Sequence, residues 1–299
     1  MNTNALLLTL DRRAIEYKTE YSLCHHVSFK LECMAALAIF PATEQELIEA
    51  VSACRQTEHP YVLLGRGSNL FFARAHYDGA VILTERLSAV ECTGNTVQAA
   101  CGVSLTGLAA KVAKMGLSGL EFAYGIPGSV GGAVFMNAGA YGGAISDVLT
   151  ESRAYDPSSG QILTLREHAF GYRESIYMKQ RGWICLSATF SLLVDTPMAI
   201  EGKMRGYMDS RKEKQPLEYP SAGSYFKRPT GHFAGKLIEE CGLKGLRVGG
   251  AEVSEKHAGF FINRGGATAA DVLTLEEQVR SAVQERFGVV LEREVRVVE

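Results

Sequence analysis

Residues 125–143 read GIPGSVGGAVFMNAGAYGG and contain seven glycines, one proline and one asparagine. Glycine is used where the backbone takes a positive φ or approaches another group closely, and elsewhere it costs conformational entropy. We therefore expect this segment to hold a large flat or phosphorylated ligand against the main chain, with backbone N–H groups as donors. The segment is interpreted as a cofactor cradle, and a purely structural set of turns is the alternative.

A second glycine-containing loop lies upstream, after a predicted helix and strand. Residues 43–46 read TEQE, which is typical of a capping box at the start of a helix, and the apolar run 61–64 predicts a buried strand. The loop Gly65-Arg66-Gly67-Ser68-Asn69 follows and suits a diphosphate, although a plain tight loop is the alternative. A Rossmann domain is disfavoured, because Leu70 and Phe71 follow in place of a helix and residues 76–79 indicate another turn.

The composition excludes several classes of function. The 299-residue chain is long enough for two or three domains, and its formal net charge of -2 gives no basic field for nucleic acid or an anionic membrane. No basic segment precedes the short apolar run 5–8, and no apolar stretch approaches about 20 residues, so we expect a cytoplasmic protein without membrane insertion. Seven scattered cysteines without a C-x-x-C pair predict reduced thiols, and the histidine spacing predicts no metal site.

The remaining pattern predicts an α+β chain with a domain boundary near residue 200. Short strands are expected at 80–83 and 184–192, with a helix at 106–115 between them. The character of the sequence changes after Pro197. Beyond it we predict helices over 204–214, 233–241 and 269–287, the last ended by Gly288, a turn over 216–224 and a strand over 289–298.

Reactive side chains stand out in three further places. Arg173, in the segment Tyr172–Tyr177, suits a carboxylate or phosphate, and a surface pair with Glu174 is the alternative. Ser224 is a turn former, a cap or a proton donor, without a Ser-His-Asp pattern beside it. Glu292 and Glu294 share a strand face, for which a solvated edge is the default, and His257 is read as a satisfied, half-buried histidine. Residue types alone therefore indicate a nucleotide or cofactor site and an anionic substrate.

Taken in order, these segments resemble the UDP-N-acetylenolpyruvoylglucosamine reductases, flavoenzymes that complete UDP-N-acetylmuramate in bacterial peptidoglycan synthesis. The resemblance runs from about His25 to Arg296, and the compact PSAGS region looks like the shorter of two subtypes. The matching segments are LLGRGSNL at 63–70, GLEFAYGIPGSVGGAVFMNAGAYGG at 119–143, YRESIY at 172–177, PSAGSYFKRP at 220–229, AGKLIEECGLKG at 234–245, HAGFFIN at 257–263 and LEREVR at 291–296.

The resemblance implies an FAD-binding fold of the vanillyl-alcohol-oxidase (PCMH) type. Two α+β subdomains would span 1–78 and 79–198, a separate α+β substrate domain would span 199–289, and the tail 290–299 would return to the first subdomain. FAD would be bound by the loop residues Gly65, Arg66, Gly67, Ser68, Asn69 and Leu70, and by Gly125, Ile126, Pro127, Gly128, Gly131, Gly132, Asn137, Ala138 and Gly139 of the glycine segment.

The resemblance also implies a reaction and a catalytic set. NADPH would deliver hydride to FAD, which would pass it to the enolpyruvyl methylene of UDP-N-acetylglucosamine enolpyruvate. Arg173 would stabilise the charge that develops, Ser224 would donate the proton to C2, and Glu294 would position the carboxylate-bearing end. Substrate contacts are expected from Tyr172, Lys214, Lys227 and Arg228, of which Lys214 matches a substrate-contacting basic position.

This chain departs from the family pattern in two places. Glu32-Cys33 replaces a Gly-Gly pair of many relatives, and Tyr124 precedes GIPG where relatives often carry a small residue or cysteine. Neither change touches the catalytic set, so we expect any effect to fall on flavin affinity. The alternatives are an FAD oxidoreductase acting on an alcohol or a sugar, and a nucleotide-binding protein without redox activity.

Overall fold

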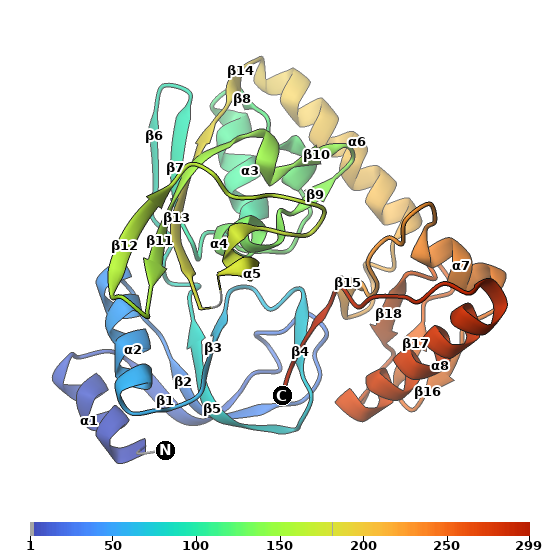
Figure 1. Cartoon of the computed structure of the whole chain (residues 1–299). Helices are drawn as coiled ribbons and strands as arrows, with labels where there is room; N and C mark the ends of the chain where they lie inside the picture. The colour runs from blue at the N-terminus through green and yellow to red at the C-terminus, as the bar shows by residue number, and fades with distance from the viewer. Residues whose placement is uncertain (1–2, 181) are drawn as a thin grey trace. The chain divides into compact units, whose positions relative to one another are not determined.

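The computed structural model describes residues 3–180 and 182–299, which form two compact units (Figure 1). The first unit comprises the chain up to Glu20 together with Ala36–Arg66 and Asp78–Asp209. The second comprises Tyr21–Ala35, Gly67–Tyr77 and Ser210–Glu299. The division falls within helix α6 (Pro197–Lys214), and the three-part domain limits inferred from the sequence stay a prediction.

A four-stranded sheet with two covering helices forms one part of the first unit. Its order is β1-β2-β5-β3, with β3 parallel to β5, and residues of both helices, such as Leu10 and Val51, are fully buried against it. The strand predicted from the apolar run at 61–64 is confirmed as β3. The elements are α1 (Thr3–Arg12), β1 (Tyr17–Ser22), β2 (Met34–Ile39), α2 (Glu44–Gln56), β3 (Tyr61–Leu64) and β5 (His76–Leu83).

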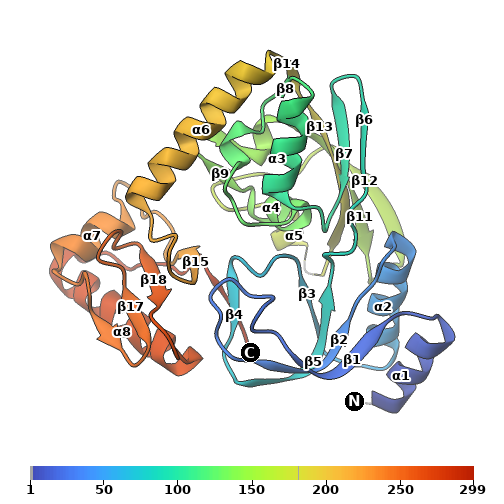
Figure 2. The same ribbon diagram turned by 180° about the vertical axis from the view of Figure 1, so that it is seen from behind.

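A five-stranded antiparallel sheet forms the other part of the first unit. Its order is β12-β11-β13-β7-β6, and helices α3 and α4 lie against one face in both views (Figure 2). Val97 and Ala99 of β7 point to that face, as the two-residue strand period requires. The elements are β6 (Val90–Thr93), β7 (Thr96–Ala100), α3 (Leu105–Lys114), α4 (Val130–Met136), β11 (Leu149–Asp156), β12 (Gln161–Leu165) and β13 (Ile184–Ser191).

Short elements connect the layers of the first unit. They comprise β8 (Leu117–Ser118), β9 (Gly139–Ala140), β10 (Gly143–Ala144), α5 (Ile176–Lys179), β14 (Leu193–Val194) and the 3-10 turns η1 (Glu121–Ala123) and η2 (Ile145–Asp147).

The second unit contains an antiparallel sheet of order β15-β18-β17-β16 with two helices packed on it. Its long helix was predicted to the residue: Thr268 caps the N-terminus, and Gly288 ends it in a left-handed conformation with φ 67. The chain terminus pairs in parallel with the strand after the glycine loop. The elements are β4 (Leu70–Phe72), β15 (Ser221–Ser224), α7 (Ala234–Glu240), β16 (Arg247–Val248), β17 (Ala251–Val253), β18 (Phe260–Asn263), α8 (Ala269–Phe287) and β19 (Arg296–Val298).

Three sequence-based boundaries were wrong. Residues 76–79, predicted as a turn, begin β5, because a neighbouring strand pairs with this turn-like sequence. Ser221–Ser224 forms β15 in place of the end of a turn, since it pairs with β18. The strand predicted over 289–298 is confined to Arg296–Val298, where β4 supplies a partner. In addition, α6 starts earlier than predicted, at Pro197, a residue type tolerated in the first turn of a helix.

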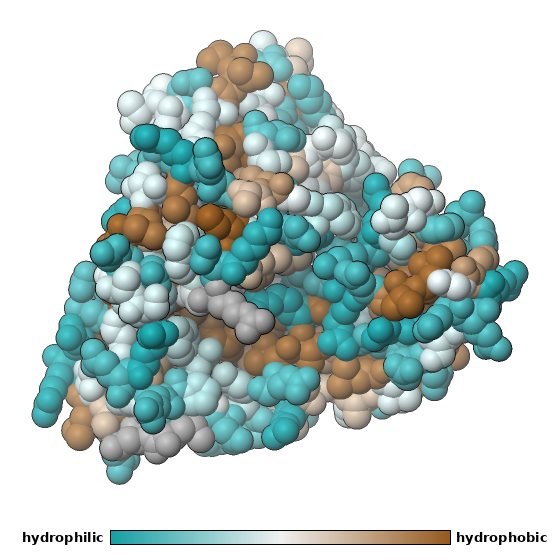
Figure 3. All heavy atoms as spheres, in the orientation of Figure 1, coloured by the Kyte–Doolittle hydropathy of each residue, from teal (hydrophilic) through white to brown (hydrophobic). Residues whose placement is uncertain are grey.

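Apolar side chains are exposed where β14 meets the start of α6. Leu193, Val194 and Met198 are 74%, 83% and 83% exposed, and apolar atoms gather at the corresponding place in the space-filling view (Figure 3). Within the part of the chain that the structure describes, no helix has the length and apolarity needed to cross a bilayer.

We predict that Thr43→Ala lowers the free energy of unfolding by about 1 kcal/mol, as is typical when an N-cap is lost. The hydroxyl of Thr43 accepts the N–H of Glu46 at 3.1 Å, and the Glu46 carboxylate accepts the N–H of Ala42 at 2.8 Å. Urea denaturation measures the effect. Thr43→Ser retains the acceptor and is expected to stay close to the parent protein; an equal loss in both variants would contradict the capping role.

Candidate functional site

The segment that carries Arg173 is bound to the glycine segment by three side-chain hydrogen bonds. Asn137 Nδ2 donates to the Gly171 carbonyl at 3.0 Å, and Ser175 Oγ donates to the Phe135 carbonyl at 2.7 Å. Arg173 Nη2 donates to the Gly139 carbonyl at 3.1 Å. Two motifs that the sequence marked separately therefore form one structural assembly in the first unit.

Two residues of this assembly have a strained backbone conformation. Arg173 has φ 58 and Asn137 has φ 42, a left-handed region that non-glycine residues rarely occupy. Asn137 ends α4 in this conformation, and its Oδ1 also accepts the N–H of Ser146 at 3.0 Å. The Arg173 guanidinium lies 5.1 Å from the centre of the Tyr172 ring, which is itself 49% exposed. Strained residues that surrounding hydrogen bonds hold in place are typical of functional sites. This conformation therefore supports Arg173 as a candidate functional residue.

Packing within the protein requires several glycines of the 125–143 segment. A Cβ at Gly131 would lie 2.8 Å from the Cβ of Cys101, and one at Gly143 would lie 2.7 Å from the Phe122 ring. The N–H of Gly131 donates to the Cys101 carbonyl, and that of Gly132 donates to the hydroxyl of Ser129, the cap of α4. A purely structural role therefore explains these two glycines. Their N–H groups already donate hydrogen bonds within the protein.

The loop after β3 has the form expected of an anion-binding turn. Gly67 is buried with φ 55, and a Cβ there would collide with the carbonyl oxygen of His26. Among the described residues, the N–H groups of Arg66, Gly67 and Ser68 donate no hydrogen bond. Consecutive free N–H groups around a left-handed glycine suit the oxygens of a diphosphate. The loop therefore fits a diphosphate, the group that its residues suggested, and the family resemblance implies that this diphosphate is that of FAD.

Ser224 and Glu294 lie on adjoining segments of the second unit. Ser224 is exposed at the end of β15, after Gly223 with φ 81. The carbonyl of the next residue, Tyr225, accepts the N–H of Glu294 at 2.9 Å, and the N–H of Lys227 donates to the Glu292 carbonyl at 2.8 Å. The structure therefore joins the segments that carry two of the three predicted catalytic residues, whereas Arg173 belongs to the other unit.

The predicted substrate-binding cations have partners of their own or end a helix. Lys227 Nζ lies 3.3 Å from the exposed carboxylate of Glu292, a pair whose contribution to stability is small. The Arg228 guanidinium lies 4.8 Å from the centre of the Phe233 ring, and Lys214 is the last residue of α6. Nothing in these contacts assigns a ligand to them.

Two further residues behave as simple structural ones. Nδ1 of His257 accepts the N–H of Gly259 at 3.1 Å, and burial lowers the pKa of this half-buried ring, which fits a satisfied histidine. Cys33, at one of the departures from the family, is buried, and burial raises its pKa to about 11. The seven cysteines form no disulfide in the described part of the chain, and their reduced state stays a prediction.

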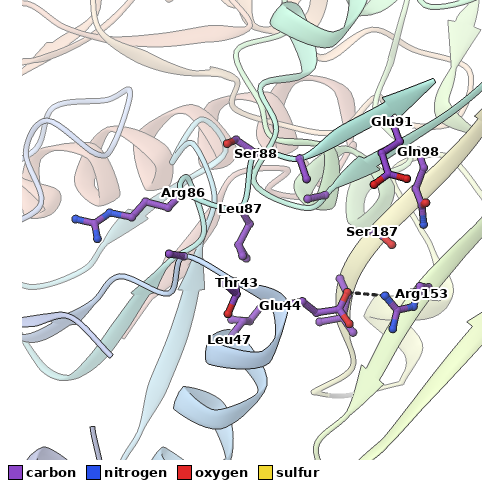
Figure 4. Close-up of a pocket in the computed structure, with 14 residues that line it drawn as sticks. Thr43, Glu44, Leu47, Arg86, Leu87, Ser88, Glu91, Gln98, Arg153 and Ser187 are labelled. Atoms are coloured by element: carbon purple, nitrogen blue, oxygen red, sulfur yellow. Dashed lines mark hydrogen bonds and ion pairs between the residues drawn. The ribbon is translucent and has the colours of Figure 1, made fainter. Parts of the chain in front are cut away.

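A cavity of ≈ 620 Å³ lies elsewhere in the first unit, at the start of α2 and beside the five-stranded sheet (Figure 4). None of the predicted site residues lines it. Both of its arginines are paired: Arg153 contacts Glu44 at 2.7 Å, and Arg86 contacts Glu16 at 2.6 Å. The sequence contained no signal for this cavity, because its lining comes from five separate stretches of the chain.

Comparison with known proteins defines first a class and then a family. Residues 35–166 match the model of the FAD binding domain, and residues 215–298 match the model of the UDP-N-acetylenolpyruvoylglucosamine reductase C-terminal domain. With the α+β fold and its glycine-containing loops, the chain is an FAD-dependent oxidoreductase, and the predicted fold class is confirmed.

The curated relatives are similar over nearly the full length. The UDP-N-acetylenolpyruvoylglucosamine reductase of Clostridium novyi (strain NT) is 46% identical over 95% of this chain and 92% of its own length. The enzyme of Clostridium botulinum (strain Hall) is 47% identical over 91% and 89%. The crystal structure of the enzyme (MurB) from Thermus caldophilus has a TM-score of 0.79 at 35% identity, covering 95% of this chain and 99% of that one. The chain belongs to the UDP-N-acetylenolpyruvoylglucosamine reductase family.

We predict that acidification below about pH 6.5, the ordinary pKa of histidine, destabilises the protein partly through His168. This ring is 5% exposed and its Nε2 is 2.8 Å from Ser152 Oγ, and burial lowers its pKa. The unfolded chain then binds a proton that the folded state resists, so the free energy of unfolding falls as the pH falls.

His168→Gln is expected to reduce this loss between about pH 7 and about pH 5, measured by urea denaturation at each pH. Some loss remains in the variant, since burial also lowers the pKa values of His59 and His257. An unchanged pH profile in the variant would rule out the contribution of His168.

Proposed function

We propose that the protein reduces UDP-N-acetylglucosamine enolpyruvate to UDP-N-acetylmuramate, with NADPH as co-substrate and FAD as bound cofactor, in the cytoplasmic stage of bacterial peptidoglycan synthesis. Family membership supports this reaction. The single observation that carries it in this chain is the hydrogen-bonded arrangement of the Ser224 and Glu294 segments, which suits a proton donor beside a carboxylate.

FAD, when bound, would accept hydride from NADPH and supply it to the enolpyruvyl methylene carbon. The loop Gly65–Leu70 would hold the diphosphate through the N–H groups of Arg66, Gly67 and Ser68, and residues 125–128 and 137–139 of the glycine segment would line the rest of the cofactor. The fit of the loop supports this role. At position 67, glycine is the residue type that is compatible with both the positive φ and the close contact with the His26 carbonyl.

Arg173 would stabilise the negative charge that develops at C2 and on the substrate carboxylate. Its planar guanidinium is suited to a carboxylate, and its hydrogen bond to the Gly139 carbonyl and its position over Tyr172 restrict its orientation. A group placed before the charge develops needs no reorganisation during the reaction, so the strained conformation of Arg173 would serve preorganisation.

Ser224 would donate the proton to C2, and Glu294 would position and polarise the carboxylate-bearing end. A serine hydroxyl is a weak acid, so it protonates only a strongly basic carbon, which is the species that hydride addition to the methylene produces. The exposed position of Ser224 at the end of β15 leaves its hydroxyl accessible to substrate. Tyr172, Lys214, Lys227 and Arg228 are retained as proposed substrate contacts.

The visible absorption spectrum tests the proposed function. The purified protein is recorded as isolated, after anaerobic NADPH, and after addition of UDP-N-acetylglucosamine enolpyruvate. We expect an oxidised flavin spectrum that NADPH bleaches and the enolpyruvyl substrate restores. Bleaching without restoration would reject the substrate, and a protein that fails to take up added FAD would reject the flavin assignment.

We predict that Ser224→Ala slows substrate-dependent reoxidation by about 10²- to 10⁴-fold, the usual contribution of a general acid. Reduction by NADPH needs no proton from this residue and is expected to stay near the parent rate. Stopped-flow absorbance separates the two steps. Ser187→Ala is the matched control, because its buried hydroxyl has no hydrogen-bond partner among the described residues. Equal slowing of both steps in Ser224→Ala would show that Ser224 is not the proton donor.

A further inference from the structure

A carboxylate is buried in the apolar core of the second unit. Glu276 lies on α8, is 3% exposed, and shares the buried helix face with Val272, Leu275 and Val279. Removing a carboxylate from water is unfavourable unless it is paired and hydrogen-bonded. A glutamate at this position therefore points to a role other than packing, since an apolar residue would pack on this helix face without the cost of burying a charge.

The partners of Glu276 come from two distant segments. Its Oε2 accepts the hydroxyl of Tyr225 at 2.8 Å and the Nε–H of Arg293 at 2.8 Å, and it lies 2.7 Å from Nη2 of the same guanidinium as an ion pair. Its Oε1 accepts no hydrogen bond among the described residues, although Nη1 of Arg280 lies 3.6 Å away. One oxygen thus joins both segments while the other is poorly satisfied, an arrangement that stability alone does not favour.

Both partners are immediate neighbours of proposed catalytic residues. Tyr225 follows Ser224, and Arg293 precedes Glu294. Phe226 and Arg293 form an antiparallel bridge, and the N–H of Glu294 donates to the Tyr225 carbonyl. The carboxylate of Glu276 therefore braces, through side chains, the same two segments that these main-chain contacts join.

The burial of Tyr225 beside an exposed Ser224 makes this brace a constraint on the site. Ser224 ends β15 and is exposed, whereas the next residue, Tyr225, is buried at 1% exposure. The Tyr225 ring is also stacked on Phe261, with ring centres 4.1 Å apart. A fixed Tyr225 ring thus restricts the direction in which the adjacent Ser224 hydroxyl points.

We propose that Glu276 is a positioning residue, which through Tyr225 and Arg293 holds Ser224 and Glu294 in the relative placement that proton transfer to the substrate requires. The inference rests on the proposed function, because it takes Ser224 as the proton donor. Glu276 touches neither substrate nor cofactor in this scheme. It acts on the step that uses Ser224 and not on the reduction by NADPH.

Two variants of the FAD-loaded protein test the proposal. Glu276→Gln keeps the shape but removes the charge that binds Arg293, and Tyr225→Phe removes only the hydroxyl that Glu276 accepts. Because a misplacement of about 1 Å in a catalytic group lowers rates by up to about a hundredfold, we expect each variant to slow substrate-dependent reoxidation by about ten- to a hundredfold. Reduction by NADPH is expected to change by less than about twofold, since this step uses neither segment.

Tyr155→Phe is the matched control. Tyr155 is 3% exposed, and its hydroxyl lies 2.9 Å from Ser52 Oγ in the first unit, so the variant loses one buried hydroxyl contact of the same kind. Melting temperatures are compared across the three variants. We expect the Tyr155→Phe and Tyr225→Phe proteins to melt at similar temperatures, while only the latter changes the ratio of the two half-reaction rates.

The outcomes separate this inference from the function on which it rests. A parent protein that NADPH reduces and the enolpyruvyl substrate reoxidises, with Ser224→Ala impaired in reoxidation, upholds the proposed function by itself. If Tyr225→Phe then reoxidises at the parent rate, or slows both half-reactions equally, the positioning role of Glu276 is wrong. If Glu276→Gln does not fold, Tyr225→Phe alone decides between these results.

Discussion

Close packing of the glycines in residues 125–143 against neighbouring segments is the constraint on which the candidate site in the first unit depends. Gly131 lies against Cys101 so tightly that a side chain would separate α4 from the segment that follows β7, and Gly143 is equally confined by Phe122. The packing places the end of α4, and with it the carbonyl of Gly139 and the amide of Asn137, where they bind the segment that carries Arg173. The strained conformation of Arg173 persists because these bonds outweigh its local preference.

In the second unit, the proposed reactive groups are oriented in a different way. Ser224 and Glu294 belong to segments that are distant in sequence, and neither segment is regular along its whole length. Main-chain hydrogen bonds join the two segments, and the buried carboxylate of Glu276 links the side chains that flank the two residues. A strained loop therefore orients the proposed charge-stabilising residue, whereas a buried polar network orients the proposed proton donor. In the function that we propose, both arrangements serve the same reaction.

Local patterns in the sequence predicted the elements that depend on local interactions. Helix α8 was placed correctly because its cap at Thr268 and its stop at Gly288 involve residues within a few positions of the helix ends. Residues 76–79 were misread as a turn, since their pairing with a strand far along the chain overrides a turn-like composition. The same reason confined the final strand to the residues that find β4 as a partner. The domain limits and the catalytic roles stay predictions.

The sequence by itself determined the family, the class of cofactor and the residues proposed for catalysis, because each rests on residue types at fixed spacing within short motifs. Only the tertiary structure decided which glycine N–H groups are already engaged as donors and which belong to a loop that fits a diphosphate. It alone also revealed the role we propose for Glu276. A glutamate in a long charged helix gives no local sign of burial, and its hydrogen-bond partners lie 51 and 17 residues away, beyond the reach of any periodic pattern.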